Sequence, residues 1–571
     1  MDILKRTFLY IKTKPIYIAT VIIGILLCVA NIRYGYFQLS TRLCHELKEV
    51  GNWDSYLYYA VGHGMSEGLV PYKDMYENKP PLVFLLVSIS YKIWGNYRLL
   101  NVLSFLSLLT ILVVPVAFTV IKCIKHKTNS AFSVLLVALT FNCSTLLALF
   151  SQENSGQAQI ETLATACGIL SVFFSTLIKD EAKFYSPFVV LCGIFFGLCT
   201  MFKEPFSLIC GTSLLLFTKN FRNILKTVVF PLIYAIITAL LILFFSNCFV
   251  PYFTIYLKNM FSSHINIYGS PFKRMMNIKI LFDYSYAFSK ALPLIYLSTL
   301  VASTYYNAVQ FYHRNFSLNL ILKCVCGLKP FAFLYVTSFV VGLGGQYYNH
   351  HFIFATTFFV ALIMNVVDFI SRGKSKFISF DLSENMPEAN NSAFLEDKNH
   401  YANVFLQKLI IYPLIVCFCI FSISTYKKMH NPTDVFKIIE IQSEEVKLKA
   451  RYLDEVLSCL NEETYLWIGF NGYTPFAHTK HLPSGPCFAQ DENNFQKENF
   501  FTEEFLKQLN ETNVIIAPSL NFRLGIITSQ VNDYVYANFT LSPPTSLYSA
   551  NIEKPTCFNY VILYRKNAFT Y

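Results

Sequence analysis

The sequence predicts a polytopic α-helical membrane protein with a small α/β domain at its C-terminal end. Of its 571 residues, 54% are hydrophobic and only 14% are charged, whereas a soluble domain has about 25% charged residues. Apolar runs of roughly 17 to 25 residues, long enough to cross a bilayer as a helix, recur as far as residue 424. We therefore divide the chain into a membrane part, residues 1–424, and a C-terminal domain, residues 425–571.

The hydropathy pattern predicts about 11 spans, within a range of about 10 to 13. The first apolar run follows several basic residues, but no small-residue cleavage site comes after it, so we expect it to be retained. The segment from Pro80 to Trp94 is only about 15 residues long and is expected to lie at the membrane surface. The predicted spans are residues 16–32, 98–121, 131–149, 158–178, 185–202, 205–218, 227–250, 290–309, 330–345, 352–370 and 405–424.

The distribution of Lys and Arg predicts the orientation. If the N-terminus is cytoplasmic and Pro80 to Trp94 does not cross, the basic short loops all fall inside, as the positive-inside rule requires. The outer face then carries the first outer loop, residues 33–97, the short turn 151–157, the loop 251–289, the turn 344–351 and the C-terminal domain. The net charge of +11 therefore reflects topology, and it does not predict a nucleic-acid partner.

The C-terminal domain is predicted from short buried runs separated by polar segments. Residues 465–470, 513–518 and 558–565 are typical of buried strands, and residues 503–510 are typical of a helix. About 140 residues are enough for one small core.

The first outer loop combines a carboxylate with a helix start. Lys79-Pro80-Pro81 is expected to begin a helix, because proline fits the first helical turn. Free amides at such a start, together with the Lys79 charge, favour an anion, and a phosphate at headgroup depth is the natural ligand. Asp54 has the chemistry of a general base for an acceptor hydroxyl. The alternatives are that Lys79 anchors the helix to anionic lipid and that Asp54 caps its own helix.

Two ionisable residues lie at the predicted outer ends of apolar spans. An acid such as Glu161 on an apolar span is costly and usually faces a cavity or a partner. Lys203, at the next outer turn, is likewise expected to face a cavity or a partner.

Other candidates lie in the outer loops and turns. His350 and His351 have the chemistry to position or protonate a leaving phosphate, and Tyr347 stands beside them. The alternative for all three is an interfacial aromatic belt. Lys273 and Arg274 are candidate phosphate contacts in the basic loop 251–289, or else a solvated charge pair.

The motif pattern of the first loop resembles that of a known superfamily. It is similar to the GT-C superfamily of polyprenol-phosphate-sugar glycosyltransferases, and most of all to the branch of lipid A aminoarabinose transferases and protein O-mannosyltransferase-like enzymes (glycosyltransferase family 39-like). Ser55 is a departure, since several relatives carry a second acid there. The residues that carry the resemblance are Asp54, Gly68, Pro71, Tyr72, Asp74, Lys79, Pro80, Pro81, Gly95 and Arg98.

The resemblance implies transfer of a sugar from a polyprenyl-phosphate donor to an acceptor hydroxyl of a lipid, glycan or protein, on the extracytoplasmic face of a bacterial inner membrane. It makes Asp54 the catalytic carboxylate and Lys79 a donor-phosphate residue, with Lys203, His350 and His351 as further phosphate contacts. No nucleotide-binding fingerprint and no Asp-x-Asp pair in the outer loops is present, so we expect neither metal nor cofactor. The alternatives are a multi-span lipid or glycan transporter or flippase, and a polysaccharide polymerase.

Overall fold

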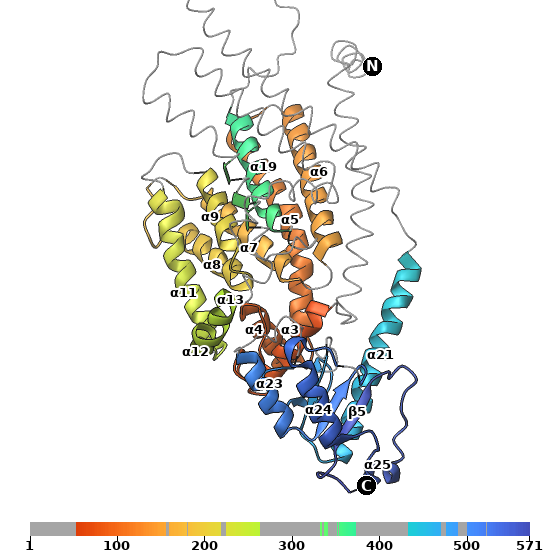
Figure 1. Ribbon diagram of the computed structural model, residues 1–571. Helices are drawn as coiled ribbons and strands as arrows, with labels where there is room; N and C mark the ends of the chain where they lie inside the picture. The colour runs from red at the N-terminus through yellow and green to blue at the C-terminus, as the bar shows by residue number, and fades with distance from the viewer. Residues whose placement is uncertain are drawn as a thin grey trace, which may run out of the picture.

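The computed structural model describes the greater part of the chain and shows a mostly helical protein with a small sheet near its C-terminus (Figure 1). The described residues are 53–128, 130–155, 159–179, 181–217, 224–262, 354–372, 432–469, 476–488, 500–520 and 522–570, with short pieces at 332–333, 336–337, 339–340, 351 and 353. The predicted spans at 16–32, 290–309 and 405–424 lie outside these residues, as does most of 330–345.

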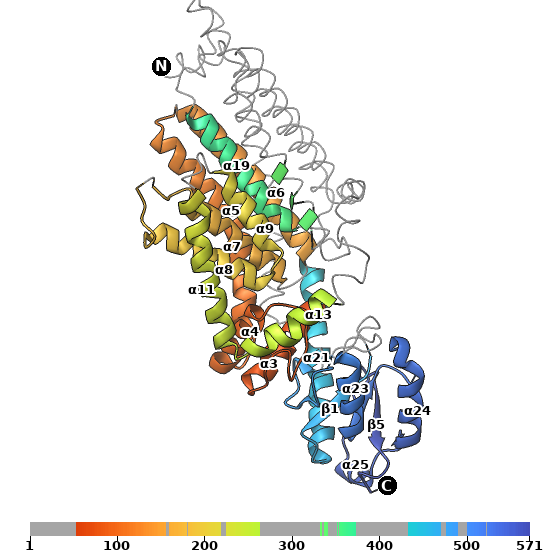
Figure 2. The ribbon, with the colours of Figure 1, turned by 60° about the vertical axis from the view of Figure 1, so that its left-hand side comes forward.

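Apolar helices form a bundle in which α7 is central, because it contacts α5, α8, α9 and α19, while α8 packs on α11 (Figures 1 and 2). Two short π-helical segments, η1 and η2, lie before and after α11. The helical elements of this part are α3 (Trp53–Ser66), α4 (Leu82–Trp94), α5 (Arg98–Lys125), α6 (Ser130–Ser155), α7 (Ile160–Ser175), α8 (Pro187–Phe202), α9 (Phe206–Leu216), η1 (Leu225–Val229), α11 (Phe230–Phe245), α12 (Phe249–Pro251), η2 (Tyr252–Tyr256), α13 (Leu257–Ser262) and α19 (Phe354–Arg372).

Several of these helices coincide with predicted spans. Within the described residues, Arg98–Lys125 and Leu225–Phe245 are long and apolar enough to cross a membrane, and further apolar helices are shorter. Only 22% of the most apolar window of Leu225–Phe245 is buried, and Phe244 and Phe245 are 72% and 66% exposed. An apolar helix that leaves most of its surface uncovered has the character of a helix that faces lipid.

The close packing of α8 on α11 depends on two glycines four residues apart. A Cβ atom added at Gly193 would lie 2.5 Å from the Pro231 carbonyl oxygen, and one added at Gly197 would lie 2.7 Å from that of Ala235. Small residues at this spacing let two membrane helices approach until their backbones touch. The glycines therefore set the distance between α8 and α11.

The C-terminal part forms a mixed five-stranded sheet with strand order β2-β1-β3-β5-β4. β1 pairs parallel with β2 and β3, while β5 pairs antiparallel with β3 and β4. Three strands, β1, β3 and β5, lie within or overlap the segments for which the sequence predicts strands. The elements are α21 (Pro432–Cys459), β1 (Thr464–Trp467), β2 (Leu482–Pro483), α23 (Phe500–Glu511), β3 (Val514–Ala517), η7 (Gly525–Ile527), α24 (Thr528–Asn538), β4 (Phe539–Thr540), α25 (Thr545–Ala550) and β5 (Val561–Arg565).

The C-terminal domain packs on α3, α4 and the start of α5 (Figure 2). The Tyr91 and Tyr97 hydroxyls both donate to the Ala477 carbonyl oxygen, at 3.1 and 2.5 Å. Nδ1 of His63 lies 3.4 Å from the Phe476 carbonyl oxygen. These contacts hold the domain against the first outer loop, at the end of the bundle where α5 begins.

We predict that Gly193→Ala destabilises the protein, because the new Cβ would meet the α11 backbone closer than atoms can approach. Overpacking of this kind costs about 1–3 kcal/mol. The change is measured as thermal unfolding of the detergent-solubilised protein.

Gly211→Ala on α9 is the matched control, because its nearest neighbour would be the Phe196 ring at an ordinary 3.9 Å. At that position the larger effect is the gain in helix propensity, which should raise the free energy of unfolding by about 0.5–1 kcal/mol. Equal effects of the two substitutions would contradict the close approach of α8 and α11.

Candidate active site

The turn at residues 68–75 of the first outer loop is stabilised by positive φ angles and by local hydrogen bonds. Gly68 and Tyr72 adopt the left-handed region, with φ of 100° and 68°. The Tyr72 amide donates to the Met75 carbonyl at 2.8 Å, and the Val70 amide donates to Asp74 Oδ2 at 2.8 Å. The Asp74 carboxylate of the motif therefore stabilises the turn that it belongs to.

This turn is connected to the start of α4. The helix begins at Leu82, directly after the two prolines, with Pro81 as its N-cap residue, so the predicted helix start is confirmed. The Tyr72 hydroxyl donates to the Lys79 carbonyl oxygen at 2.8 Å. That hydrogen bond fixes the backbone of Lys79 relative to the loop.

Asp54 lies in the first turn of α3. Its Oδ2 accepts a 2.7 Å hydrogen bond from Nε2 of Gln159, the residue that precedes α7. The residues before Trp53 lie outside the described part, so the capping alternative for Asp54 stays a prediction. What the structure adds is that Asp54 joins the beginnings of α3 and α7.

Glu161 and Lys203 form an ion pair, with Lys203 Nζ 2.8 Å from Glu161 Oε1. The Glu161 side chain is 1% exposed and that of Lys203 is 17% exposed. A buried carboxylate is costly without a partner, and Lys203 supplies one from the turn between α8 and α9. The assignment of Lys203 to a donor phosphate stays a prediction.

Glu204, next to Lys203, was not predicted from the sequence. Its Oε1 accepts hydrogen bonds from the hydroxyls of Tyr256 at 2.7 Å and Tyr252 at 3.1 Å, both on η2. Burial raises the pKa of Glu204, while the two tyrosine hydrogen bonds and the Lys203 charge oppose the shift. The Tyr72 ring packs on that of Tyr256 with centroids 4.8 Å apart, so η2 is also connected to the first loop.

Glu77 is the second acid that the sequence did not reveal. Its Oε1 lies 3.8 Å from Lys79 Nζ. Burial raises the pKa of Glu77 to about 7, against the opposing charge of Lys79. Burial would by itself lower the pKa of Lys79, but neighbouring carboxylates, led by Glu77 and Asp54, raise it above its usual value.

These side chains form one group at one end of the bundle, which we call the charged cluster. The negative charges of all four carboxylates of the group raise the pKa of Lys79, although the six residues come from four segments of chain. It brings together four of the residues predicted from the sequence and adds two acids. Its members are Asp54, Glu77, Lys79, Glu161, Lys203 and Glu204.

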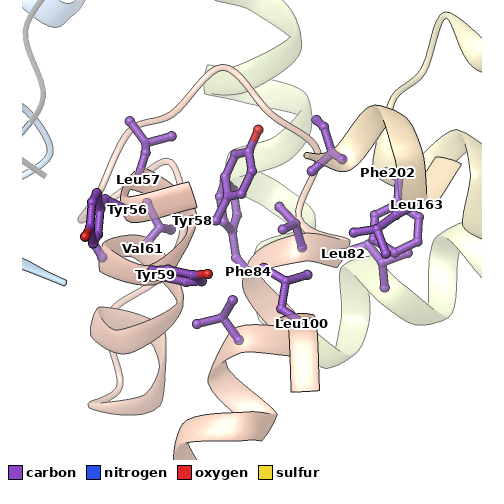
Figure 3. Packing of buried hydrophobic residues seen from close by; sticks show 14 of the residues in the cluster. Tyr56, Leu57, Tyr58, Tyr59, Val61, Leu82, Phe84, Leu100, Leu163 and Phe202 are labelled. Atoms are coloured by element: carbon purple, nitrogen blue, oxygen red, sulfur yellow. The ribbon is translucent and has the colours of Figure 1, made fainter. Parts of the chain in front are cut away.

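Hydrophobic packing borders the charged cluster. Figure 3 shows Leu82, Leu163 and Phe202 close together, and these residues stand within three positions of Lys79, Glu161 and Lys203 along the chain. Each is buried. Such surroundings strengthen the interactions among the charges, because the local dielectric constant is low.

The remaining predicted residues are not part of the described cluster. Tyr347, His350, Lys273 and Arg274 lie outside the described residues. His351 is described and is 8% exposed. It lies two residues before Ile353, whose carbonyl accepts a 3.2 Å hydrogen bond from Thr165 of α7.

Within the described part of the chain, neither a metal-binding group nor the hollow between α5 and α6 coincides with the charged cluster. Among the described residues, no three His, Cys, Asp or Glu side chains are grouped so as to hold a metal ion, and the expected metal-free reaction stays a prediction. A hollow of about 590 Å³ opens between α5 and α6 beside Cys123 and Lys127, at the opposite end of α5 from Arg98.

Comparison with known proteins gives a likeness to solved structures alone. No family model matches the chain, and no curated protein matches it. The structure of ArnT from Cupriavidus metallidurans bound to undecaprenyl phosphate is 12% identical, with 96% of this chain and 99% of that chain covered and a TM-score of 0.45. The apo state of ArnT is 11% identical, with 89% and 92% covered and a TM-score of 0.46.

We predict that the stability of the protein falls as the pH rises through the pKa of Glu77. The folded-state pKa of about 7 lies above the ordinary value of 4.5, so the folded protein holds a proton that the unfolded chain releases. The resulting stabilisation is complete below pH 4.5 and is lost as the pH rises through 7. Glu77→Gln should flatten this part of the profile of thermal midpoint against pH.

The control is Glu67→Gln, which removes the same charge from an exposed position at the end of α3. It should leave the pH profile of the wild-type protein unchanged. A Glu77→Gln profile that runs parallel to the wild type from pH 4.5 to 8 would contradict the assignment to Glu77.

Proposed function

We propose that the chain is a membrane glycosyltransferase that moves a sugar from a polyprenyl-phosphate donor to an acceptor hydroxyl, on the extracytoplasmic face of the membrane. The observation that carries this proposal is the charged cluster at the end of an apolar helix bundle, in which Lys79 Nζ lies 3.8 Å from Glu77 Oε1 and the charge of Asp54 acts on Lys79. A lipid-linked donor requires both parts at once: a site for a phosphate and an apolar surface beside it for the chain.

The membrane setting is supported by the exposed apolar surface of α11, where Leu240 and Leu241 are 43% and 50% exposed besides the two phenylalanines at its end. In water this face would favour association with other hydrophobic surfaces. In a bilayer it is solvated by acyl chains. A donor that carries its sugar on a long lipid would reach the cluster from that same environment.

The proposed reaction is an inverting displacement. The acceptor hydroxyl oxygen forms a bond to the anomeric carbon, and its proton passes to the Asp54 carboxylate. The bond from the anomeric carbon to the phosphate oxygen breaks, and its electron pair leaves with polyprenyl phosphate. Lys79 stabilises the negative charge that develops on that phosphate, and a positioned cation in a water-poor site contributes strongly to such a step.

The positions of these groups favour an enzyme over a transporter. Transporters place substrate residues and interrupted helices near the bilayer midplane, whereas Lys79 lies three residues before the start of α4 and Lys203 directly follows α8. Donor specificity would distinguish the proposed enzyme from a polymerase that uses lipid pyrophosphate donors. Mass spectrometry of envelope lipids, glycans and proteins with and without this chain would identify the sugar and the acceptor.

We predict that Asp54→Asn abolishes transfer while the protein stays folded. The amide oxygen can still accept the hydrogen bond from Gln159, but it cannot take up a proton, and loss of a general base typically lowers the rate about 10²- to 10⁴-fold. The measurement is release of polyprenyl phosphate from a panel of undecaprenyl-phosphate sugars in the presence of an envelope extract.

The control is Asp74→Asn. The side-chain oxygen of the asparagine can still accept the hydrogen bond that the Val70 amide now donates to the Asp74 carboxylate. This variant should keep transfer within a few fold of the wild type. Full activity of Asp54→Asn would overturn the assignment of Asp54 as base.

We also predict that Lys79→Met weakens binding of undecaprenyl phosphate by at least about tenfold, because a charged hydrogen bond contributes about 1.5–3 kcal/mol. Lys73→Met is the control, since the Lys73 side chain is 66% exposed in the same loop and should not affect binding. Equal affinities of the two variants, measured by titration of the lipid in nanodiscs, would place the phosphate elsewhere.

A further inference from the structure

Tyr58 carries a buried hydroxyl for which the described residues supply no hydrogen-bond partner. It stands four residues after Asp54 on α3, on the same helix face, and its side chain is 0% exposed. Its ring lies beside Phe84, with centroids 6.5 Å apart (Figure 3). Among the described residues its Oη atom has no hydrogen-bond partner. Buried polar groups are nearly always paired, so this hydroxyl calls for a partner that is not part of the chain described.

The Tyr58 hydroxyl lies within the field of the charged cluster. Burial raises the pKa of Tyr58 well above its ordinary value, and the negative charges of Asp54, Glu161 and Glu77 raise it further. The phenol is therefore protonated and can donate a hydrogen bond. It makes none to the neighbouring carboxylates of Asp54, Glu161 and Glu77.

Gln159, next to Asp54, carries a second polar atom that has no hydrogen-bond partner among the described residues. A carboxylate accepts hydrogen bonds and cannot donate them, so the amide nitrogen of Gln159 must face Asp54 Oδ2. This leaves Oε1 of Gln159 as an acceptor. The residue is 3% exposed, and Oε1 has no partner among the described residues.

The two groups select the chemistry of a ligand. The oxygens of a phosphodiester accept hydrogen bonds only, so they cannot satisfy Gln159 Oε1. A hydroxyl group both donates and accepts. It can accept from Tyr58 and donate to Gln159 or to Asp54, which is the arrangement that an attacking or neighbouring sugar hydroxyl requires.

We propose that Tyr58 and Gln159 bind a hydroxyl group of a sugar substrate beside Asp54. This inference rests on the proposed function and names the hydroxyl subsite that adjoins the phosphate position at Lys79. The hydroxyl belongs either to the sugar carried by the donor or to the acceptor. Both sources present the same group to Tyr58, and the experiment separates them.

The test uses Tyr58→Phe, which removes one oxygen and keeps the ring that packs beside Phe84. Tyr59→Phe is the matched control on the same helix, because the Tyr59 hydroxyl donates to Asn101 Oδ1 at 2.7 Å in the buried interior. Both variants are prepared as the full chain in nanodiscs. Thermal unfolding, lipid binding and transfer are measured for each.

The two substitutions should have different effects: Tyr58→Phe should impair transfer without lowering stability, and Tyr59→Phe should lower stability without weakening substrate binding. Tyr58→Phe should unfold at the wild-type temperature or above it, because it removes an unpaired buried hydroxyl, and it should impair transfer about tenfold, the worth of one lost hydrogen bond of about 1.4 kcal/mol. Tyr59→Phe should unfold at a lower temperature, because the buried hydrogen bond from Tyr59 to Asn101 is lost, and should keep the wild-type substrate affinities.

Binding distinguishes the two sources of the hydroxyl. If the donor sugar is bound, Tyr58→Phe weakens binding of undecaprenyl-phosphate sugars about tenfold and leaves binding of undecaprenyl phosphate unchanged. If the acceptor is bound, both lipids bind as in the wild type, and release of undecaprenyl phosphate needs about tenfold more envelope extract.

Two results would overturn the inference. One is a Tyr58→Phe protein as destabilised as Tyr59→Phe, which would show that the hydroxyl has a structural partner. The other is a Tyr58→Phe protein with wild-type binding and transfer, which would show that it holds a water only. A wild-type protein that processes no donor of the panel would instead overturn the proposed function, while the unfolding comparison would still test whether the hydroxyl is unpaired.

Discussion

The arrangement of this end of the molecule depends on how four carboxylates and two lysines are kept together in a mostly buried site. An isolated buried charge is prohibitively costly, and removing one partner of a buried pair commonly costs about 3–5 kcal/mol. Glu161 is 1% exposed and relies on Lys203, and Glu204 relies on two tyrosine hydroxyls. The ends of α7 and α8 and the segment η2 are therefore held in place by charge compensation as well as by hydrophobic packing.

The first-loop pattern acquires a physical explanation from these contacts. Gly68 supplies a positive φ, and Asp74 binds a backbone amide of its own turn. Tyr72 joins that turn to the Lys79 carbonyl and packs on Tyr256. Gly68, Tyr72 and Asp74 thus shape the loop, which presents the charged groups of Asp54 and Lys79.

The sequence predicted the parts of the site that depend on local structure. The prolines after Lys79 set a helix start, and an acid on an apolar helix, Glu161, indicated a cavity or a partner. Glu77, Gln159 and Tyr58 could not be predicted, because their roles exist only where α3, the first loop and α7 meet. Glu204 adjoins Lys203 in a turn that was noted, but its tyrosine partners lie 48 and 52 residues further along the chain.

The surplus of acids has a consequence for a phosphate ligand. With every group ionised, four carboxylates oppose two lysines, and a phosphate would enter a negative site. The raised pKa of Glu77, about 7, relieves this conflict because Glu77 can be protonated near neutral pH. A phosphate bound at Lys79, as proposed, would compete for the ammonium and add negative charge near Glu77, raising its pKa further. Donor binding and proton uptake would then be linked, and Glu77 would return its proton when the phosphate leaves.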